Sequence, residues 1–273
     1  MAKKILRLPS VSRVAANSRA ILELPIGPTY KRIVLIGTAS SGLAEAQIGR
    51  IDVNINAKTI QTFKNAQRLR EMNAFYNRSP DTLSGTAMEY TLHFERAELH
   101  NLIDRRAPGL GTADVATFTV EIDLAAVPAS FTLTAFAEID PMPQPLGMFT
   151  RIREFPFNAP AAGVVEMDKF PRSGLYQAIH MNKSDVSYVE LEGNQVKLVD
   201  ASKAVLHRVA KEGAPVKRAP IDASYTHLDF ATDGDLSQSV IASQLGDFRL
   251  KMTCTTSGAF DLITETLDSL SAI

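Results

Sequence analysis

One short stretch of this chain occurs twice, and the repeat limits the possible folds more than any other feature of the sequence. Residues 25–33 read PIGPTYKRI and residues 171–179 read PRSGLYQAI, so a proline, a tyrosine and an isoleucine recur 146 residues apart. Three matching positions are weak by themselves, but the same succession of short strands and helices follows each copy. A repeat on this scale predicts two similar units in tandem.

The first half contains strands whose side chains alternate between apolar and polar. Within residues 50–56, Ile51, Val53 and Ile55 fall on one side and the intervening polar residues on the other. This alternation predicts half-buried strands of an antiparallel sheet. Further predicted strands cover residues 20–26, 30–36, 88–94, 117–124 and 131–139. Helical spacing of apolar residues predicts helices over 62–75 and 97–106.

The second half repeats this order. At a separation of 136 residues, Val53 matches Val189, Ile55 matches Leu191, Ile60 matches Val196, Leu92 matches Leu228 and Phe94 matches Phe230. At a separation of 130, Phe118, Val120 and Ile122 match Phe248, Leu250 and Met252. Helices are expected over 202–211 and 236–245, and a last strand over 260–267. The sequence predicts an all-β fold of two tandem eight-stranded jelly-roll sandwiches with short helices in the connections.

Composition and charge indicate where the predicted domains begin and end. Residues 1–19 contain five basic residues and no acidic one, which predicts a basic N-terminal arm, and the first jelly roll is expected over 20–140. Residues 141–163 contain five of the fourteen prolines and are expected to form a crossover rather than a continuous helix or central strand. The second jelly roll is expected over 164–273.

The overall composition excludes several classes of protein. The net charge of −1 gives no reason to expect direct nucleic-acid binding. No run of about 18 apolar residues is present, so no membrane span is expected, and Arg7, Pro9 and Arg13 interrupt any signal-peptide core. The basic arm has two interpretations: a disordered tail, or a peripheral contact with anionic lipid or a membrane protein.

Paired carboxylates suggest one enzymatic alternative. Glu121 with Asp123, and Glu138 with Asp140, are spaced as two acids on one side of a strand. Two nearby carboxylates could cleave a glycosidic bond, so a carbohydrate-binding or glycan-cleaving β-sandwich is the alternative function. A solvated sheet face is the favoured interpretation, and the absence of tryptophan also weighs against sugar stacking. No catalytic residue and no enzyme activity are predicted.

One acidic pair and five histidines are the remaining candidates for ligand binding. Asp233 and Asp235 could bind calcium, although capping of the helix that begins at Leu236 is the favoured role of Asp235. The histidines at positions 93, 100, 180, 207 and 227 have no metal-binding spacing, and structural roles are expected for each.

Several stretches together resemble a known family. They read PIGPTY, GRIDVNINAKTIQTFK, LHFE, TFTVEIDL, FPRSGLYQAIHM and LDFATDGDLSQSVIASQLGDFRLKM. In their order and extent, from about Ser10 to the last strand, they are similar to the major capsid protein of the corticoviruses, tailless icosahedral phages with an internal membrane.

The resemblance implies a structural role. It implies a double jelly-roll subunit of the virion, made in the host cytoplasm, of which three copies form a pseudo-hexagonal homotrimeric capsomer. The expected partners are further copies of the chain, neighbouring capsomers and other virion proteins. The shell would cover a membrane, no cofactor would be required, and calcium would be a structural ion.

Overall fold

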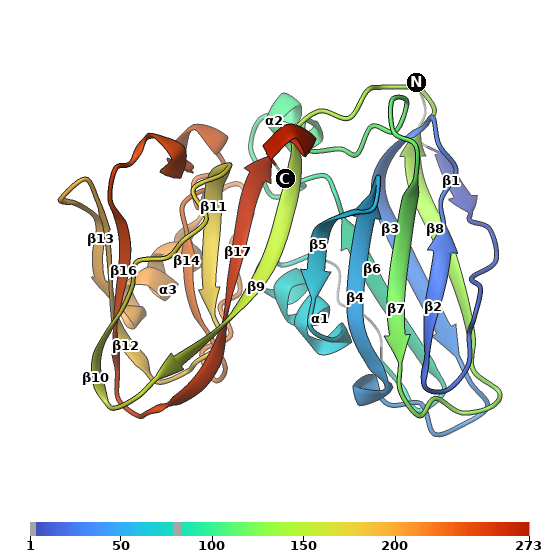
Figure 1. The fold of residues 1–273 in the computed structure, drawn as a ribbon, viewed down its shortest axis with the longest axis horizontal. Coiled ribbons are helices and arrows are strands. Elements are labelled where there is room, and N and C mark those ends of the chain that lie inside the picture. The colour runs from blue at the N-terminus through green and yellow to red at the C-terminus, as the bar shows by residue number, and fades with distance from the viewer. Residues whose placement is uncertain (1–3, 79–82, 273) are drawn as a thin grey trace. The chain divides into compact units, whose positions relative to one another are not determined.

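The computed structural model describes residues 4–78 and 83–272, which divide into two compact units (Figure 1). The first unit comprises residues up to 97 and 102–150, and the second comprises 98–101 and 151–272. No helix among the described residues is both long enough and apolar enough to cross a membrane.

The first unit has eight strands in its described part. They are β1 (Lys4–Arg7), β2 (Ser18–Glu23), β3 (Thr29–Thr38), β4 (Ile48–Ile55), β5 (Lys58–Phe63), β6 (Ala87–His93), β7 (Phe118–Leu124) and β8 (Thr132–Asp140). One sheet has the order β1-β8-β3-β6, and the strands of the other follow the order β5-β4-β7-β2. The short helices η1 (Glu45–Gln47), α1 (Ala66–Phe75) and α2 (Leu102–Arg106) lie in the connections.

The second unit repeats this arrangement. Its strands are β9 (Phe149–Ala159), β10 (Gly163–Met167), β11 (Leu175–Met181), β12 (Val186–Gly193), β13 (Val196–Ser202), β14 (Thr226–Asp229), β15 (Val240–Ile241), β16 (Phe248–Cys254) and β17 (Gly258–Asp268). Its helices are α3 (Lys203–Glu212), η2 (Leu236–Gln238), η3 (Ala242–Gln244) and η4 (Leu270–Ala272). The strand orders are β14-β11-β17-β9 and β10-β16-β12-β13, with β15 added beside β11. If β15 is set aside, these are the strand orders of the first unit, and the predicted double jelly roll is confirmed.

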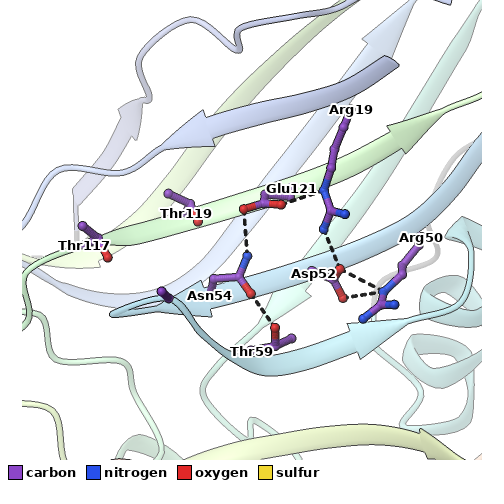
Figure 2. Close-up of a pocket in the computed structure, with 9 residues that line it drawn as sticks. Arg19, Arg50, Asp52, Asn54, Thr59, Thr117, Thr119 and Glu121 are labelled. Carbon is purple, nitrogen blue, oxygen red and sulfur yellow. Dashed lines mark hydrogen bonds and ion pairs between the residues drawn. The ribbon is translucent and has the colours of Figure 1, made fainter. Parts of the chain in front are cut away.

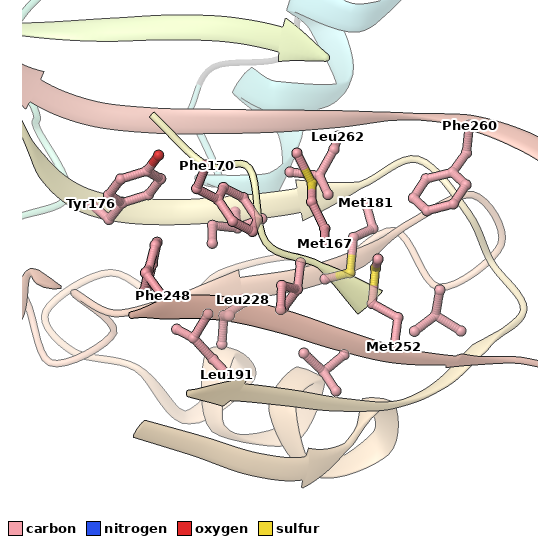
Figure 3. Packing of buried hydrophobic residues seen from close by; sticks show 14 of the residues in the cluster. Met167, Phe170, Tyr176, Met181, Leu191, Leu228, Phe248, Met252, Phe260 and Leu262 are labelled. Atoms are coloured by element: carbon pink, nitrogen blue, oxygen red, sulfur yellow. The ribbon is translucent and has the colours of Figure 1, made fainter. Parts of the chain in front are cut away.

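Alternation of side chains explains why each unit forms two layers. In both β7 and β16, every second residue is buried and the residues between them are partly exposed. The inward residues fill the space between the sheets, while outward residues such as Glu121 form a polar face (Figure 2). Figure 3 shows the buried cluster of the second unit, in which the rings of Phe170, Tyr176 and Phe248 lie 5.3–6.2 Å apart between centroids.

The repeated proline–tyrosine stretch has the same structure in both units. Tyr30 lies in β3 and donates a 2.8 Å hydrogen bond to the Pro25 carbonyl, and Tyr176 lies in β11 and donates a 2.6 Å bond to the Pro171 carbonyl. A β-bulge follows each tyrosine. Burial raises the pKa of Tyr30 to about 12 and also raises that of Tyr176, so both hydroxyls remain donors at neutral pH.

The same two tyrosines contact corresponding aromatic residues. Tyr30 packs against Phe118 with ring centroids 5.1 Å apart, and Tyr176 packs against Phe248 at 5.3 Å. Tyr30 and Tyr176 therefore lie on corresponding strands, as the repeat predicts.

One part of the predicted alignment is wrong by two residues. The pairing register places Ile51 beside Ile122 and Val189 beside Met252, so Val189 corresponds to Ile51 rather than to Val53. The match of Ile60 with Val196 shifts in the same way. Because side chains alternate with a period of two, a shift of two residues leaves the apolar pattern unchanged, and sequence alone does not detect it.

Several predicted boundaries also differ from the structure. Lys4–Arg7 form β1, which pairs with β8, so this part of the predicted arm belongs to the first sandwich. Within the predicted crossover, 149–159 form β9 beside β17. Pro156 is exposed in that strand. Proline has no backbone N–H, so within sheets it occupies positions that need no donor.

The predicted helices are shorter than their apolar patterns suggest. Thr62 and Phe63 pair with β4, so α1 begins only after Asn65, whose side chain accepts a bond from the Arg68 amide. In the second unit, the predicted helix over 236–245 is interrupted because Val240 and Ile241 pair with β11.

We expect Tyr30→Phe and Tyr176→Phe each to lower the free energy of unfolding by about 1 kcal/mol, because each removes one hydrogen bond while keeping the ring. Denaturant-induced unfolding of the full chain measures the loss. Tyr188→Phe is the matched control, because the Tyr188 hydroxyl bonds to Asp200 at an exposed position. Equal effects of all three substitutions would contradict a special role for the repeated tyrosines.

Candidate functional site on the outer face of the first sandwich

The outer face of β5, β4, β7 and β2 carries a cluster of polar side chains (Figure 2). The cluster surrounds an open hollow of about 470 Å³. Its side chains come from alternate, outward positions of neighbouring strands, so the strand register brings them together although they are far apart in sequence. They are Arg19, Arg50, Asp52, Asn54, Thr59, Thr117, Thr119 and Glu121.

Asp52 is the centre of this cluster. Its carboxylate is almost completely buried, and it accepts bonds from Arg19 at 2.8 Å and from Arg50 at 2.9 Å. The Thr62 hydroxyl donates a third bond at 2.8 Å. A buried carboxylate needs such partners, because an unpaired buried charge is strongly destabilising. The geometry therefore indicates that Asp52 connects β2, β4 and β5.

The first predicted acid pair lies on the same face. Arg19 contacts Glu121 at 2.6 Å and Asp123 at 3.7 Å, and Glu121 also accepts a 3.1 Å bond from Asn54. Both acids are opposite the buried apolar side chains of β7, as the alternation predicts. Their carboxylates are engaged by one guanidinium group, which is the arrangement of a cross-strand ion pair rather than of an acid and a nucleophile facing a sugar.

The second acid pair is separated in its contacts. Glu138 forms a 2.8 Å ion pair with Arg32, whereas Asp140 accepts a bond from the Met142 amide in the following loop. The two side chains thus have different local partners, and the structure does not bring them together as a pair.

Asp233 and Asp235 each accept a backbone hydrogen bond. Asp235 accepts a 2.8 Å bond from the Ser237 amide and caps η2, and this bond lowers the pKa of the Asp235 carboxyl. Asp233 accepts a bond from the Asp235 amide. Calcium takes six to eight oxygen ligands, and among the described residues no group of three or more His, Cys, Asp or Glu side chains could hold a metal ion. The pair alone therefore does not fit a complete calcium site.

Three of the five histidines meet in the interior of the second unit. His180 in β11 is directly opposite His227 in β14, and their Nδ1 atoms are 2.8 Å apart. His207 in α3 accepts a 3.1 Å bond from the His227 amide. Their positions have no motif spacing, so only the strand register, which sequence does not supply, could have revealed this cluster.

Comparison with known proteins identifies the family. The viral coat protein P2 N-terminal domain matches residues 5–140, and the viral coat protein P2 C-terminal domain matches residues 149–270. The chain is 29% identical over 271 residues to the major capsid protein P2 of Pseudoalteromonas phage PM2, covering 96% of each chain.

Solved structures agree with this match. The crystal structure of the major capsid protein P2 from bacteriophage PM2 superposes with a TM-score of 0.88 at 27% identity over 98% of each chain. The Sulfolobus Turreted Icosahedral Virus structure gives a TM-score of 0.70 at 11% identity, covering 99% of this chain and 93% of that one. The PBCV-1 virus capsid gives 0.65 at 11% identity, covering 97% and 93%. The last two show the fold alone.

The two tandem jelly rolls, the two domain matches and the agreement along nearly the whole chain lead to one conclusion: the chain belongs to the viral coat protein P2 family and is a structural major capsid subunit of a virion shell.

Proposed function

We propose that three copies of this chain form a capsomer with a pseudo-hexagonal outline, and that these capsomers form the shell over an internal membrane. The observation that carries the proposal is the repeated strand order of the two sandwiches, because three chains with two similar sandwiches each supply six similar lobes. The subunit acts through shape and contact and has no enzymatic role. Its partners are other copies, neighbouring capsomers and further virion proteins.

Size-exclusion chromatography with light scattering should give a mass of about 89 kDa, three times the 29.7 kDa of one chain. An obligate trimer needs large and well-packed interfaces, so the mass should not change on moderate dilution. Negative-stain images of the same peak should show six lobes. A monomer at every protein and calcium concentration would contradict the proposal.

We also propose that the N-terminal segment contacts anionic lipid. Lys4 and Arg7 in β1 and the following Arg13 are exposed, and Ile5 beside them is 65% exposed. Arg19 is not part of this surface, because its guanidinium group binds Asp52 and Glu121. Lys3 lies outside the described residues.

Each basic residue near an anionic membrane contributes about 1 kcal/mol. Lys4→Gln with Arg7→Gln should therefore weaken binding to vesicles containing phosphatidylserine by about 30-fold, measured by co-flotation. The control, Lys169→Gln with Lys217→Gln, removes the same charge from exposed positions of the second unit. Equal binding by the two double variants would contradict a contact through β1.

For calcium, we propose that Asp233 and Asp235 bind the ion only together with oxygen ligands from a neighbouring copy. The support is that both carboxylates are exposed on the surface and that the pair alone provides too few ligands.

Asp235→Ser separates the two roles of this residue, because serine also caps helices but carries no charge. The melting temperature of the wild-type oligomer should rise in calcium relative to EDTA, and this rise should be lost in Asp235→Ser while the value in EDTA stays unchanged. Asp235→Ala should lower the melting temperature in both conditions. An identical calcium response of the wild type and Asp235→Ser would leave capping as the only role.

A further inference from the structure

The interior of the second unit contains a histidine network, which we define as His180, His207 and His227 with the carboxylates of Asp222 and Glu265. All three histidines are at most 2% exposed. His180 lies in β11, His227 in β14, His207 in α3 and Glu265 in β17, while Asp222 precedes β14. The network therefore joins α3 and the segment around residues 221 and 222 to the sheet.

The hydrogen bonds determine which nitrogen of each ring carries its proton. The Ile221 amide donates to Nε2 of His227 at 3.3 Å, so the proton of neutral His227 is on Nδ1. His227 Nδ1–H then donates to Nδ1 of His180, which places the His180 proton on Nε2, 3.3 Å from Glu265 Oε1.

The third ring follows the same reasoning. The His227 amide donates to Nε2 of His207, so His207 carries its proton on Nδ1 and donates it to the Asp222 carboxylate. In each of the three rings, the lone pair that a further proton would occupy already accepts an N–H group. A proton can therefore be added only if a hydrogen bond is broken.

Protonation of a ring breaks hydrogen bonds in the segment before β14. If His180 is protonated at Nδ1, His227 can keep this contact only by moving its own proton to Nε2, where it opposes the Ile221 amide. Protonation of His207 at Nε2 opposes the amide of His227 directly. Either event breaks a bond that holds residues 221–227.

We propose that the histidine network responds to pH. It holds α3 and residues 219–227 in place when its rings are neutral, and it releases them when the rings are protonated.

The surrounding charged groups have opposing effects. At His207, the Asp222 carboxylate raises the pKa of the ring, whereas Lys203 and Lys211 on α3 lower it. At His227, Lys203 and the two neighbouring imidazoles lower the pKa. Tyr225 stacks on the His227 ring at 5.1 Å and excludes water from that side.

Burial dominates this balance at two of the rings, because it lowers the pKa of His207 and brings that of His227 well below its ordinary value. The folded state therefore binds fewer protons than the open state. The histidine network contributes its full stabilisation above about pH 6.5, the pKa of histidine in the unfolded chain. This stabilisation decreases as the pH falls below that value.

Two features restrict the expected pH response to α3 and residues 219–227. Arg218 is buried and forms a 2.8 Å ion pair with Asp229, so the chain at residue 218 has a contact that does not involve the histidines. In the first unit, α1 occupies the corresponding position but is held by buried Leu69, Met72 and Phe75 rather than by histidine. The helix α1 contains no histidine and serves as the reference, while burial lowers the pKa of His93 in the neighbouring strand β6.

Amide hydrogen exchange of the full chain, corrected for the intrinsic rate, tests the proposal. Between about pH 7.5 and pH 5.5, peptides covering α3 and 219–227 should open at least 10-fold more often, because each histidine that gains a proton on opening contributes up to about 10-fold per pH unit below 6.5. Peptides covering α1 should change far less. An equal change in α1 and α3 would overturn the proposal.

A pair of variants tests whether the histidines cause the pH dependence of opening. His207→Gln with His227→Gln keeps an acceptor oxygen near each Nε2 position but removes the two rings whose pKa burial lowers, so most of the pH dependence should be lost. His100→Gln removes an exposed histidine and should leave it intact. A double variant that keeps the wild-type pH dependence would overturn the proposal.

Nitrogen-15 NMR of labelled wild-type histidines provides a test that does not depend on the variants folding. At about pH 7.5, His207 and His227 should show the Nδ1–H tautomer and His180 the Nε2–H tautomer. The opposite tautomer at His227 would overturn the proposal.

Discussion

The alternation of side chains along paired antiparallel strands is the constraint on which the rest of this structure depends. It assigns half of each strand to a buried layer and the other half to an outer face. In β7, for example, Val120 and Ile122 enter the core while Glu121 joins the ion pairs around Asp52. Because the inward residues supply most of the stabilisation, the outward residues can vary with the contacts that each face makes.

The two units show how far such variation extends. By strand register, Asp52 of β4 corresponds to Glu190 of β12, and Glu121 of β7 corresponds to Lys251 of β16. In the first unit, Arg19 from β2 connects the two acids. In the second unit, Lys251 contacts Glu190 directly at 3.4 Å, and Lys197 contacts it from β13 at 3.0 Å. Both faces thus keep a cross-strand charge network, although the residues that form it have changed.

The sequence predicts those features that depend on local pattern. The Pro25–Tyr30 and Pro171–Tyr176 stretches identify corresponding strands because each tyrosine bonds to a carbonyl only five residues away. Strand β1 could not be predicted, because its four residues are all exposed and have no apolar face. The pairing of His180 with His227 depends on the register between β11 and β14, and no local pattern contains that information.

The comparison of the two units also explains why the histidine network occurs in the second unit and not in the first. The register that places His180 opposite His227 places Val34 opposite Thr91 in the first unit. There, the Asn73 side chain of α1 donates to the Thr91 carbonyl at 2.8 Å, so the helix is fixed by a neutral amide. In addition, α1 buries more of its apolar residues than α3, whose buried residues are His207 and Ala210. A helix with little apolar burial depends on its polar contacts, and in α3 those contacts include the His207 ring, whose protonation opposes the amide of His227.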